Sequence, residues 1–537
     1  MSETYEIELL PHGRLIKGKG GRSLMEALVS HSIFLRSDCG GRGSCGKCKV
    51  NKINSDGHDE NITSCNYQLT GDLKIEIPET SMLSSHIVSK APVTFPGSYN
   101  NRVIEPDLWE RYGIAVDLGT TTIAVYLCDR TSGKVLSSIA VKNPQAFYGD
   151  DVMSRIAAID MEDGNLQHLQ KIVVRAIEWG ITELLKAYGI EPADITQIVT
   201  VGNPTMIHIL AGVSPASIGT FPFEPAFKEP RTILTSELGF NLVDTPLQIL
   251  PQISGFIGGD ILSAALAVDI DNQPEGTMLI DLGTNGELLL KGKDKLFATS
   301  CATGPAFEGA SLSCGMQAIP GAINKVIINK ALDFPDFTMI NSNNSSKIKP
   351  FGICGTGVIS GVAELCRNHI IEPSGAFTKG NTINPLQKDD EGRPRYILVR
   401  KESSQDGSPV FISQKDIRSV QLGKGALITG IEFLLRAAGY QTPEKIIIAG
   451  AFGTYIEKED MISLGMIPDI DPEKITVSGN SAGAGAVMVL CDKSCLDKSI
   501  EMAKKITTVD LACDPKFQEV FVQKLGFPFL KNNIHFH

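Results

Sequence analysis

"YGIAVDLGTTTIAVYLCD", residues 112–129, decides the fold of this 537-residue chain, because its pattern returns at "TMLIDLGTNGELLLKGKD", residues 277–294. Each stretch reads as an apolar strand, an Asp-Leu-Gly-Thr turn and a second apolar strand. When the two stretches are aligned on Asp117 and Asp281, the whole strand–turn–strand unit matches. A single long repeat of this kind predicts two related halves rather than a solenoid of short repeats.

Strand-like and helix-like stretches alternate in both halves. In the first half, "LQKIVVRAIEWGITELLKAYG" at 169–189 has the apolar spacing of a helix and precedes the strand-like "DITQIVTVGN" at 194–203. In the second half, residues 424–439 and 444–453 repeat this order of helix and strand. The alternation predicts α/β layers in each half.

The first eighty residues have a different pattern. Strand-like stretches at 5–10 and 72–78 flank a helical stretch at 23–33, which predicts a compact α+β module. Residues 81–110 then lose their periodicity and contain several prolines, as a linker does. The sequence therefore predicts a module at 1–80, a linker at 81–110, a first α/β half at 111–275 and a second half at 276–537.

The chain closes on a stretch that predicts a docking helix. Asp514 can cap a helix that begins at Pro515. The apolar residues that follow recur at helical spacing and form one stripe, which we expect to pack on the second half. The members of this stripe are Phe517, Val520, Phe521 and Leu525.

The composition argues against a nucleic-acid or membrane partner. A net charge of −11 would repel a phosphate backbone. The opening residues, "MSETYEIELL", lack the basic and apolar regions of a signal peptide, and we find no run of about 18 apolar residues that could span a bilayer. The sequence therefore predicts a cytoplasmic protein without a membrane span.

Four cysteines of the N-terminal module are spaced like metal ligands. Cys39, Cys45 and Cys48 follow the pattern C-x5-C-x2-C, and Cys65 stands further along the chain. Zinc ligands usually come as two close pairs, whereas three of these cysteines share one loop, which favours a [2Fe–2S] cluster over zinc. Free thiols are a third interpretation. The glycines between the cysteines would let the backbone fold tightly around inorganic sulfide.

The two Asp-Leu-Gly-Thr turns are candidate phosphate-binding loops. A glycine turn after a buried strand places N–H groups and hydroxyls around phosphate oxygens, while the aspartate faces a metal-bound water. One such turn is weak evidence, but two can bind a polyphosphate from opposite sides. The candidate residues are Asp117, Gly119, Thr120, Thr121 and Thr122 in the first turn, and Asp281, Gly283, Thr284, Asn285 and Gly286 in the second.

A third glycine-rich turn follows the strand-like stretch "IIIAGAFG" at 446–453. Gly450 and Gly453 in this turn would allow the close approach of a flat adenosine group. The alternative is that three strand–glycine turns occur by coincidence.

Four further stretches contain candidates for the same site, around Asn203, Asp260, Glu308 and Gly355. Asp260 could orient the water that attacks the γ-phosphate, or it could cap the helical stretch that follows, and the sequence does not choose between these roles. His208 lies in a helical pattern, and we expect it to be packed rather than catalytic.

The three turns resemble the phosphate-1, phosphate-2 and adenosine motifs of the superfamily that contains acetate and sugar kinases, Hsp70 and actin. The resemblance implies that ATP with Mg²⁺ binds in a cleft between two ribonuclease-H-like domains. It implies that Asp117 and Asp281 belong to the two phosphate turns, and with Asp260 they are the candidate catalytic carboxylates. The cysteine loop is similar to the C-x5-C-x2-C loop of [2Fe–2S] ferredoxins, which implies a β-grasp fold for the N-terminal module.

The ordered set of motifs, from "CGGRGSCGKC" through the two DLGT turns to "DPKFQEVF", resembles the ATP-dependent reductive activators of corrinoid proteins from end to end. The resemblance implies one-electron reduction of Co(II) to Co(I) in a corrinoid partner of a methyl-transfer system, with the electron supplied by an upstream low-potential reductant. It assigns the cluster to Cys39, Cys45, Cys48 and Cys65, and it implies a homodimer.

Two departures from the relatives matter. Larger relatives carry an extra domain between the cluster module and the ATPase, and residues 81–110 leave no room for it. Other activators carry C-terminal four-iron clusters, which this sequence lacks. Three alternatives stay open: an activator of another low-potential enzyme, a kinase with a zinc module, and an Hsp70-like binding protein.

Overall fold

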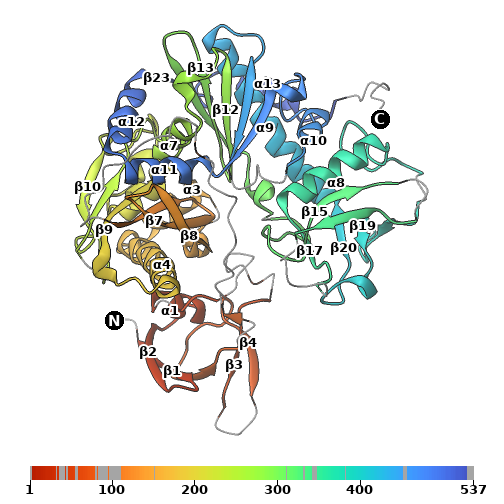
Figure 1. Ribbon diagram of the computed structural model, residues 1–537. Helices are drawn as coiled ribbons and strands as arrows, with labels where there is room; N and C mark the ends of the chain where they lie inside the picture. Colours follow the sequence, from red (N-terminus) through yellow and green to blue (C-terminus); the bar gives the residue numbers. More distant parts are fainter. Residues whose placement is uncertain are drawn as a thin grey trace. The chain divides into compact units, whose positions relative to one another are not determined.

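The computed structural model describes most of the chain. The described residues are 3–31, 33–35, 43, 46–54, 59–78, 81–82, 95, 111–149, 151–242, 244–309, 311–329, 333–340, 348–380, 383–450 and 456–528. The chain forms two compact units, and each is described by itself (Figure 1). Unit 1 falls within residues 1–90, 103–259 and 486–496, and unit 2 falls within residues 91–102, 260–485 and 497–537.

Unit 1 begins with a five-stranded sheet in the order β2-β1-β5-β3-β4. β1 pairs antiparallel with β2 and parallel with β5, so the sheet is mixed. Helix α1 (Leu24–Ser30) has Ser23 as its N-cap residue, and the Ser23 hydroxyl accepts a hydrogen bond from the Glu26 N–H at 3.2 Å. The strands are β1 (Thr4–Leu10), β2 (Arg14–Lys19), β3 (Lys49–Lys52), β4 (Glu60–Thr63) and β5 (Leu73–Glu76).

The second sheet of unit 1 has the order β10-β11-β9-β6-β7-β8. β6, β7 and β8 form an antiparallel meander, and β9 pairs parallel with β6. Helix α4 (Asn165–Tyr188) packs on β7 and β8, where Gly180 leaves room for Val125 and Ile139. The strands are β6 (Tyr112–Leu118), β7 (Thr122–Asp129), β8 (Lys134–Lys142), β9 (Ile195–Gly202), β10 (Arg231–Leu234) and β11 (Pro246–Ile249).

Short helices surround this sheet. They are η2 (Pro144–Tyr148), α3 (Val152–Met161), η3 (Pro192–Asp194), α5 (Pro204–Leu210) and α6 (Ala216–Gly219). The five-stranded sheet is not separate from this part of unit 1. Helix α1 lies beside α4 (Figure 1). The rings of Phe34 and Trp179 meet edge to face, with their centroids 6.3 Å apart. Buried side chains of both sheets form one continuous hydrophobic cluster. The N-terminal module therefore packs on the first α/β half.

The large sheet of unit 2 has the order β22-β21-β12-β13-β14-β23. β12 pairs antiparallel with β13 and parallel with β21, as β6 pairs with β7 and β9 in unit 1. This correspondence confirms the two related halves that the repeated DLGT pattern predicts. The strands are β12 (Thr277–Leu282), β13 (Gly286–Lys291), β14 (Leu296–Cys301), β21 (Lys445–Ala449), β22 (Ile475–Gly479) and β23 (Ile506–Thr508).

Helix α9 (Gln414–Ala438) packs on β13 and β14, and α13 (Phe517–Lys524) packs on α9. Phe517 stacks on Phe521 and meets Phe433 of α9, which confirms the predicted docking helix. The helix begins at Phe517 rather than at Pro515, and the Asp514 carboxylate accepts from the Lys516 N–H ahead of it. Unit 2 also contains η4 (Ile270–Asn272), η5 (Pro305–Glu308), η6 (Lys401–Ser403), η8 (Pro472–Lys474) and α10 (Lys458–Ser463).

Two small three-stranded sheets complete unit 2, in the orders β16-β15-β17 and β18-β19-β20. Helix α8 (Gly355–Arg367) packs closely on β15. The approach is so close that a Cβ at Gly357 would lie 2.2 Å from the Ile323 carbonyl oxygen. The strands are β15 (Ala322–Ile327), β16 (Asp336–Met339), β17 (Gly352–Ile353), β18 (Leu386–Lys388), β19 (Pro394–Val399) and β20 (Val410–Ser413).

Three helices stand at a boundary between the units in sequence: α7 (Gly259–Ala267), α11 (Ser481–Cys491) and α12 (Lys493–Lys505). Within the ranges that the structure describes, no helix combines the length and the hydropathy needed to cross a membrane.

Candidate functional site

The first predicted phosphate turn joins β6 to β7 in unit 1. The Gly119 N–H donates to the Thr122 carbonyl at 3.0 Å, which closes the hairpin. A Cβ at Gly119 would lie 2.7 Å from the Thr122 carbonyl oxygen, so the turn requires glycine there. Asp117 is the second-to-last residue of β6, as the sequence predicts.

The carbonyl groups of this turn point into unit 1. The Gly119 carbonyl accepts from Asn143 Nδ2 at 3.0 Å, the Thr120 carbonyl accepts from Arg155 Nη2 at 2.6 Å, and the Thr121 carbonyl accepts from the Asn143 N–H at 2.7 Å. In a planar trans peptide, the carbonyl and the following N–H point in opposite directions. The N–H groups of Thr120 and Thr121 therefore face away from these donors, which suits an anion.

Asn203 also contacts the first turn, as its place in the sequence suggested. Its side-chain oxygen accepts from the Met206 N–H at 3.0 Å and caps α5, while its amide nitrogen donates to the Thr120 hydroxyl at 2.9 Å. One side chain thus fixes both the helix start and a threonine of the turn.

His208 is a packed residue, which confirms the prediction. Its side chain is fully buried on α5 and stacks on Phe227 at 4.3 Å between ring centroids. Nδ1 donates to the Pro204 carbonyl at 2.6 Å, and Nε2 accepts from the Ala226 N–H at 3.0 Å. Burial lowers the pKa of His208, so the imidazole is neutral in this arrangement.

The second phosphate turn joins β12 to β13 in unit 2 and is one residue shorter than the first, because Leu282 pairs with Gly286 whereas Leu118 pairs with Ile123. The Gly283 N–H donates to the Asn285 carbonyl at 2.9 Å. The Thr303 hydroxyl lies 3.2 Å from the Gly283 carbonyl oxygen and 3.1 Å from that of Thr284. The N–H groups of Thr284 and Asn285 therefore face away from Thr303. The Thr284 hydroxyl donates to Glu308 Oε2 at 2.5 Å, which places Glu308 beside the turn.

Acidic side chains gather behind the second turn. Asp281 on β12 lies opposite Glu287 on β13 in the strand register. Burial raises the pKa of Glu287 well above its usual value, and the nearby carboxylates of Asp260 and Asp281 raise it further. Glu287 was not among the candidates from the sequence, because a glutamate at the start of a strand carries no signal of its own burial.

Asp260 has contacts that fit both of its predicted roles. Its Oδ1 accepts from the Ile261 N–H at 2.9 Å in the first turn of α7, as a helix-terminal residue does. Its carboxylate also lies near enough to Glu287 to raise the pKa of that group. The structure therefore brings Asp260 to the acidic group behind the second turn.

The third predicted turn begins at Gly450, after β21. Gly450 has φ +95°, and a Cβ there would lie 2.5 Å from the Leu282 carbonyl oxygen and 2.9 Å from Asp281 Oδ1. Gly450 is therefore a close neighbour of the second phosphate strand. Gly453 lies outside the described residues.

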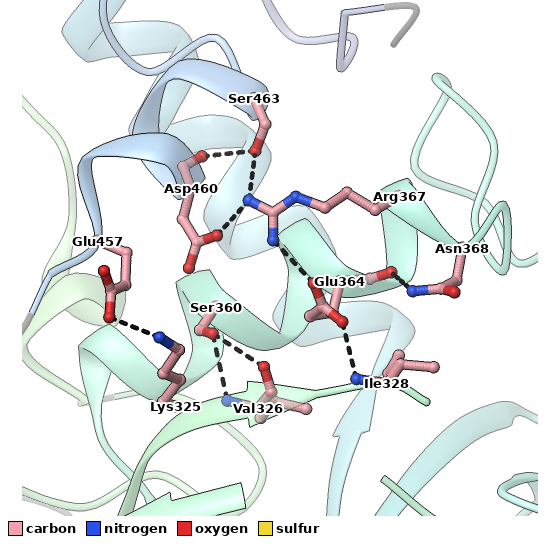
Figure 2. A network of polar contacts seen from close by, with 10 residues as sticks. All are labelled: Lys325, Val326, Ile328, Ser360, Glu364, Arg367, Asn368, Glu457, Asp460 and Ser463. Atoms are coloured by element: carbon pink, nitrogen blue, oxygen red, sulfur yellow. Dashed lines mark hydrogen bonds and ion pairs between the residues drawn. The ribbon is translucent and has the colours of Figure 1, made fainter. Parts of the chain in front are cut away.

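A polar network anchors the chain just beyond the third turn (Figure 2). Lys325 on β15 pairs with Glu457 at 2.8 Å. Arg367 on α8 pairs with Glu364 at 2.8 Å and with Asp460 on α10. Burial raises the pKa of Asp460 even though Arg367 opposes the shift. The segment that follows the third turn is thus held to α8 and β15.

The two remaining candidate stretches of unit 2 meet each other. Gly355 is the first residue of α8 and is buried, and its nitrogen would lie 3.4 Å from a Cβ on Gly309. Glu308, which precedes Gly309, binds the second turn through Thr284. Gly355 is therefore connected to the second turn through Gly309, Glu308 and Thr284.

Two of the four predicted cluster ligands are described, and they lie together. The sulfur atoms of Cys48 and Cys65 are 3.4 Å apart, and both side chains are buried. This distance exceeds the roughly 2.05 Å of a disulfide. Two thiolates bound to one tetrahedral metal at about 2.3 Å would be about 3.8 Å apart, so the pair fits a shared metal. Cys39 and Cys45 lie outside the described residues.

Two glycines of the cysteine loop have the backbone that the sequence predicts for them. Gly43 has φ +77° and Gly46 has φ +61°. A Cβ at Gly43 would lie 2.4 Å from the Asn66 amide, beside Cys65. Over the described ranges, which do not include Cys39 and Cys45, no group of three or more His, Cys, Asp or Glu is arranged to hold a metal ion.

Arg155 and Asn143 are turn-binding residues that the sequence reasoning missed. Arg155 lies on the apolar side of α3, next to Val152 and Ile156, and such a placement was the one available signal. Asn143 follows a strand like many other asparagines in turns, so nothing in its neighbourhood distinguishes it.

Comparisons with protein families cover both halves. Residues 112–273 match the model described as "RACo middle region", and residues 275–535 match "C-terminal domain of RACo the ASKHA domain". ASKHA denotes the superfamily of acetate and sugar kinases, Hsp70 and actin, so the predicted ATPase class is confirmed for residues 275–535.

The comparisons also find relatives of nearly full length. "Corrinoid activation enzyme RamQ" of Eubacterium limosum is 30% identical, with 94% of this chain and 95% of the relative covered. A "[Co(II) methylated amine-specific corrinoid protein] reductase" of Methanosarcina barkeri is 27% identical, with 78% of this chain and 77% of the relative covered.

A solved structure has the same fold over almost the whole chain. The "Reductive activator for corrinoid,iron-sulfur protein" is 28% identical, with 98% of each chain covered and a TM-score of 0.73.

Proposed function

This chain belongs to the RACo family of reductive activators of corrinoid proteins, and from that premise we propose that it reduces the Co(II) corrinoid of a partner protein to Co(I). The observation that carries the proposal is similarity to a corrinoid activation enzyme over 94% of the chain, together with two glycine–threonine turns whose carbonyl groups are held from one side. The corrinoid cobalt is the substrate and belongs to the partner protein.

The two turns supply the ATP site of the proposal. The N–H groups of Thr120 and Thr121, and those of Thr284 and Asn285, would donate to phosphate oxygens, and the hydroxyls of the turns would add further donors. Asp117 and Asp281 stand at the ends of their strands, where their carboxylates would hold the waters of Mg²⁺. The remaining turn residues of this site are Gly119, Thr122, Gly283 and Gly286. Gly450 and Gly453 would face the adenosine, and Gly355 would line the same site.

Asp260 is the carboxylate that we assign to the attacking water. Its position near Asp281 and Glu287 supports this role, since the γ-phosphate would lie between the metal ligands and the water. Its contact with Ile261 keeps the side chain at the start of α7.

The N-terminal module is the electron-transfer part of the proposal. Cys48 and Cys65 would bind one iron together, and Cys39 and Cys45 would complete the set. A [2Fe–2S] cluster, when bound, supplies one electron at a time at low potential. The mixed sheet with α1 packed on it is consistent with a β-grasp ferredoxin.

ATP hydrolysis gives the electron transfer its direction. Each 59 mV of uphill transfer of one electron costs about 1.4 kcal/mol. A conformational change driven by ATP can supply this free energy only if the two states of the protein differ in their affinity for the partner or the nucleotide. The proposal includes a low-potential donor upstream, and a homodimer as in the family.

The test is an anaerobic absorbance spectrum of Co(II) corrinoid proteins of methyl-transfer systems, each mixed with the reduced protein and scanned with and without Mg-ATP. We expect the Co(I) band to grow only with Mg-ATP and to be absent in Cys65→Ser and Asp281→Ala. Cys513→Ser is the matched control, because Cys513 is exposed and lies outside the predicted cluster. An intact cluster and measurable ATP hydrolysis without Co(I) in any partner would contradict the corrinoid proposal and favour another low-potential acceptor.

A further inference from the structure

Arg155 is a fully buried guanidinium that contacts the first phosphate turn. It lies on α3, and its exposed fraction is 0%. Its Nη2 donates to the Thr120 carbonyl at 2.6 Å, its Nη1 donates to Gln145 Oε1 at 3.1 Å, and its Nε donates to the Gly149 carbonyl at 3.0 Å. Three different nitrogens are thus engaged, and one of them reaches the turn.

The partners of Arg155 are themselves fixed. The Gln145 N–H donates to Asn143 Oδ1 at 3.0 Å, and Gln145 Nε2 donates to the Leu169 carbonyl at 3.0 Å. Asn143 is fully buried and binds the carbonyls on both sides of Thr120. Asn143, Gln145 and Arg155 therefore form one buried network that holds the inner side of the turn.

This network determines the direction of the two outward N–H groups. Each peptide plane of the turn can rotate unless its carbonyl is held, and rotation would swing the following N–H away from an anion. The planar guanidinium presents its donors in a fixed fork, so contacts at Gln145 and Gly149 set the position of the nitrogen that reaches Thr120. A lysine ammonium has no such fork and would not be aligned in this way.

We propose that Arg155 is a positioning residue for nucleotide binding, which holds the Thr120 carbonyl so that the Thr121 N–H points at a phosphate group of ATP. The inference rests on the proposed function, because it needs the first turn to bind phosphate. Arg155 itself does not touch the nucleotide. It acts through the backbone of the turn, from the side of α3.

The test compares Arg155→Met and Arg155→Lys with the wild-type protein for binding of Mg-ATP and of adenosine, by displacement of a fluorescent nucleotide. We expect both variants to bind Mg-ATP about tenfold more weakly, the size of a change of about 1.4 kcal/mol. Adenosine affinity should stay within about twofold, because a nucleoside has no phosphate for the turn to bind.

Arg130→Met is the matched control. Arg130 also binds neutral acceptors in unit 1, the Leu490 carbonyl, Thr196 and Gln197, but it stands at the opposite end of the β6–β7 hairpin. We expect Arg130→Met to lower thermal stability without changing the ratio of the two affinities.

A second measurement does not depend on a ligand. Hydrogen exchange of the Thr120 and Thr121 amides in the nucleotide-free protein should be faster in Arg155→Lys than in the wild type, while the amides of β9 are unchanged. Asn143→Ala should give the same result from the other side of Thr120, and it replaces the Arg155 variants if these do not fold.

Several outcomes would overturn the inference. Wild-type Mg-ATP affinity in Arg155→Lys would mean that charge, not the fork, matters at this position. Equal losses for Mg-ATP and adenosine would mean a general loss of structure. A wild-type protein that binds no Mg-ATP would overturn the proposed ATP site itself, and this result is distinct because it needs no variant.

Discussion

Glu287 is an acidic residue behind the second turn, and its surroundings raise its pKa. It is buried behind the turn, and both burial and the carboxylates of Asp260 and Asp281 raise its pKa. A buried acid of this kind avoids an uncompensated charge by keeping its proton. Its hydroxyl can then donate a hydrogen bond, whereas a third carboxylate beside Asp281 would repel the other two.

Glu287→Gln should flatten the dependence of stability on pH. The folded state binds the Glu287 proton more tightly than the unfolded state, so this group favours folding below its unfolded pKa of about 4.3 and the advantage is lost as pH rises toward the folded pKa. Glutamine mimics the protonated acid at every pH. Between pH 5.5 and 8.0 we expect the wild-type Tm to fall by about 2–4 °C more than that of the variant, measured by calorimetry.

Glu287→Asp is the control, because it keeps a titrating carboxyl and should keep the pH dependence. A parallel decline of Tm in the wild type and in Glu287→Gln would contradict the assignment of a bound proton to Glu287.

At the scale of elements, the decisive contact is the approach of the end of β21 to β12. The two strands pair in parallel, with Asp281 opposite Ala449. The chain then turns at Gly450, whose N–H donates to the Gly479 carbonyl at 2.9 Å. The turn passes so near Asp281 that only glycine fits. The third motif is thus tied to the second by backbone packing.

Gly450→Ala should destabilise the protein more than Gly439→Ala. Both glycines have positive φ, +95° and +79°, but a Cβ at Gly439 meets nothing within 4 Å, whereas one at Gly450 meets Leu282 and Asp281. Gly439→Ala should cost about 1–2 kcal/mol, the penalty of the left-handed backbone alone. Urea unfolding should give at least about 1 kcal/mol more for Gly450→Ala. Equal losses would mean that the close approach at Gly450 has no energetic weight.

At the scale of the whole chain, the N-terminal module and the first half belong to one compact unit. Arg22, just before α1, pairs with Glu162, which ends α3, and Lys19 lies 3.4 Å from the same carboxylate. The pKa of Glu162 is lowered, chiefly by its hydrogen bond with Arg22. Helix α3 also carries Arg155, so one helix contacts both the N-terminal module and the first phosphate turn.

Glu162→Gln should loosen the N-terminal module without unfolding it. Exposed ion pairs contribute little to global stability, because solvent screens them, so the Tm should change little. The contact between α1 and the end of α3 depends on the Arg22–Glu162 ion pair more than the global stability does. We therefore expect faster hydrogen exchange of the α1 amides in Glu162→Gln than in the wild type.

Glu183→Gln is the control for this prediction. Glu183 forms a similar ion pair with Lys186 on α4, away from α1, and its loss should leave the exchange of α1 unchanged. Unchanged exchange of α1 in Glu162→Gln would mean that apolar contacts such as Phe34 with Trp179 suffice to dock the module.

The sequence alone determined the features that depend on neighbouring residues. The DLGT turns, their strands and the duplication follow from a glycine between two apolar runs, because a hairpin is specified by its own few residues. The packed role of His208 followed in the same way from its place within a helical pattern. A metal site at the cysteines stays a prediction from their spacing, and the sulfur atoms of Cys48 and Cys65 lie 3.4 Å apart.

Only the tertiary structure decided which distant side chains meet at these turns. Arg155 reaches Thr120 from a separate helix, and Gly450 abuts Asp281 across a parallel strand pair. Burial, and after it the carboxylates of Asp260 and Asp281, raise the pKa of Glu287. A guanidinium on α3 or a glutamate on β13 has the same local sequence whether it faces water or the core. Burial and neighbouring charge are set when separate segments pack together, so no reading along the chain could supply them.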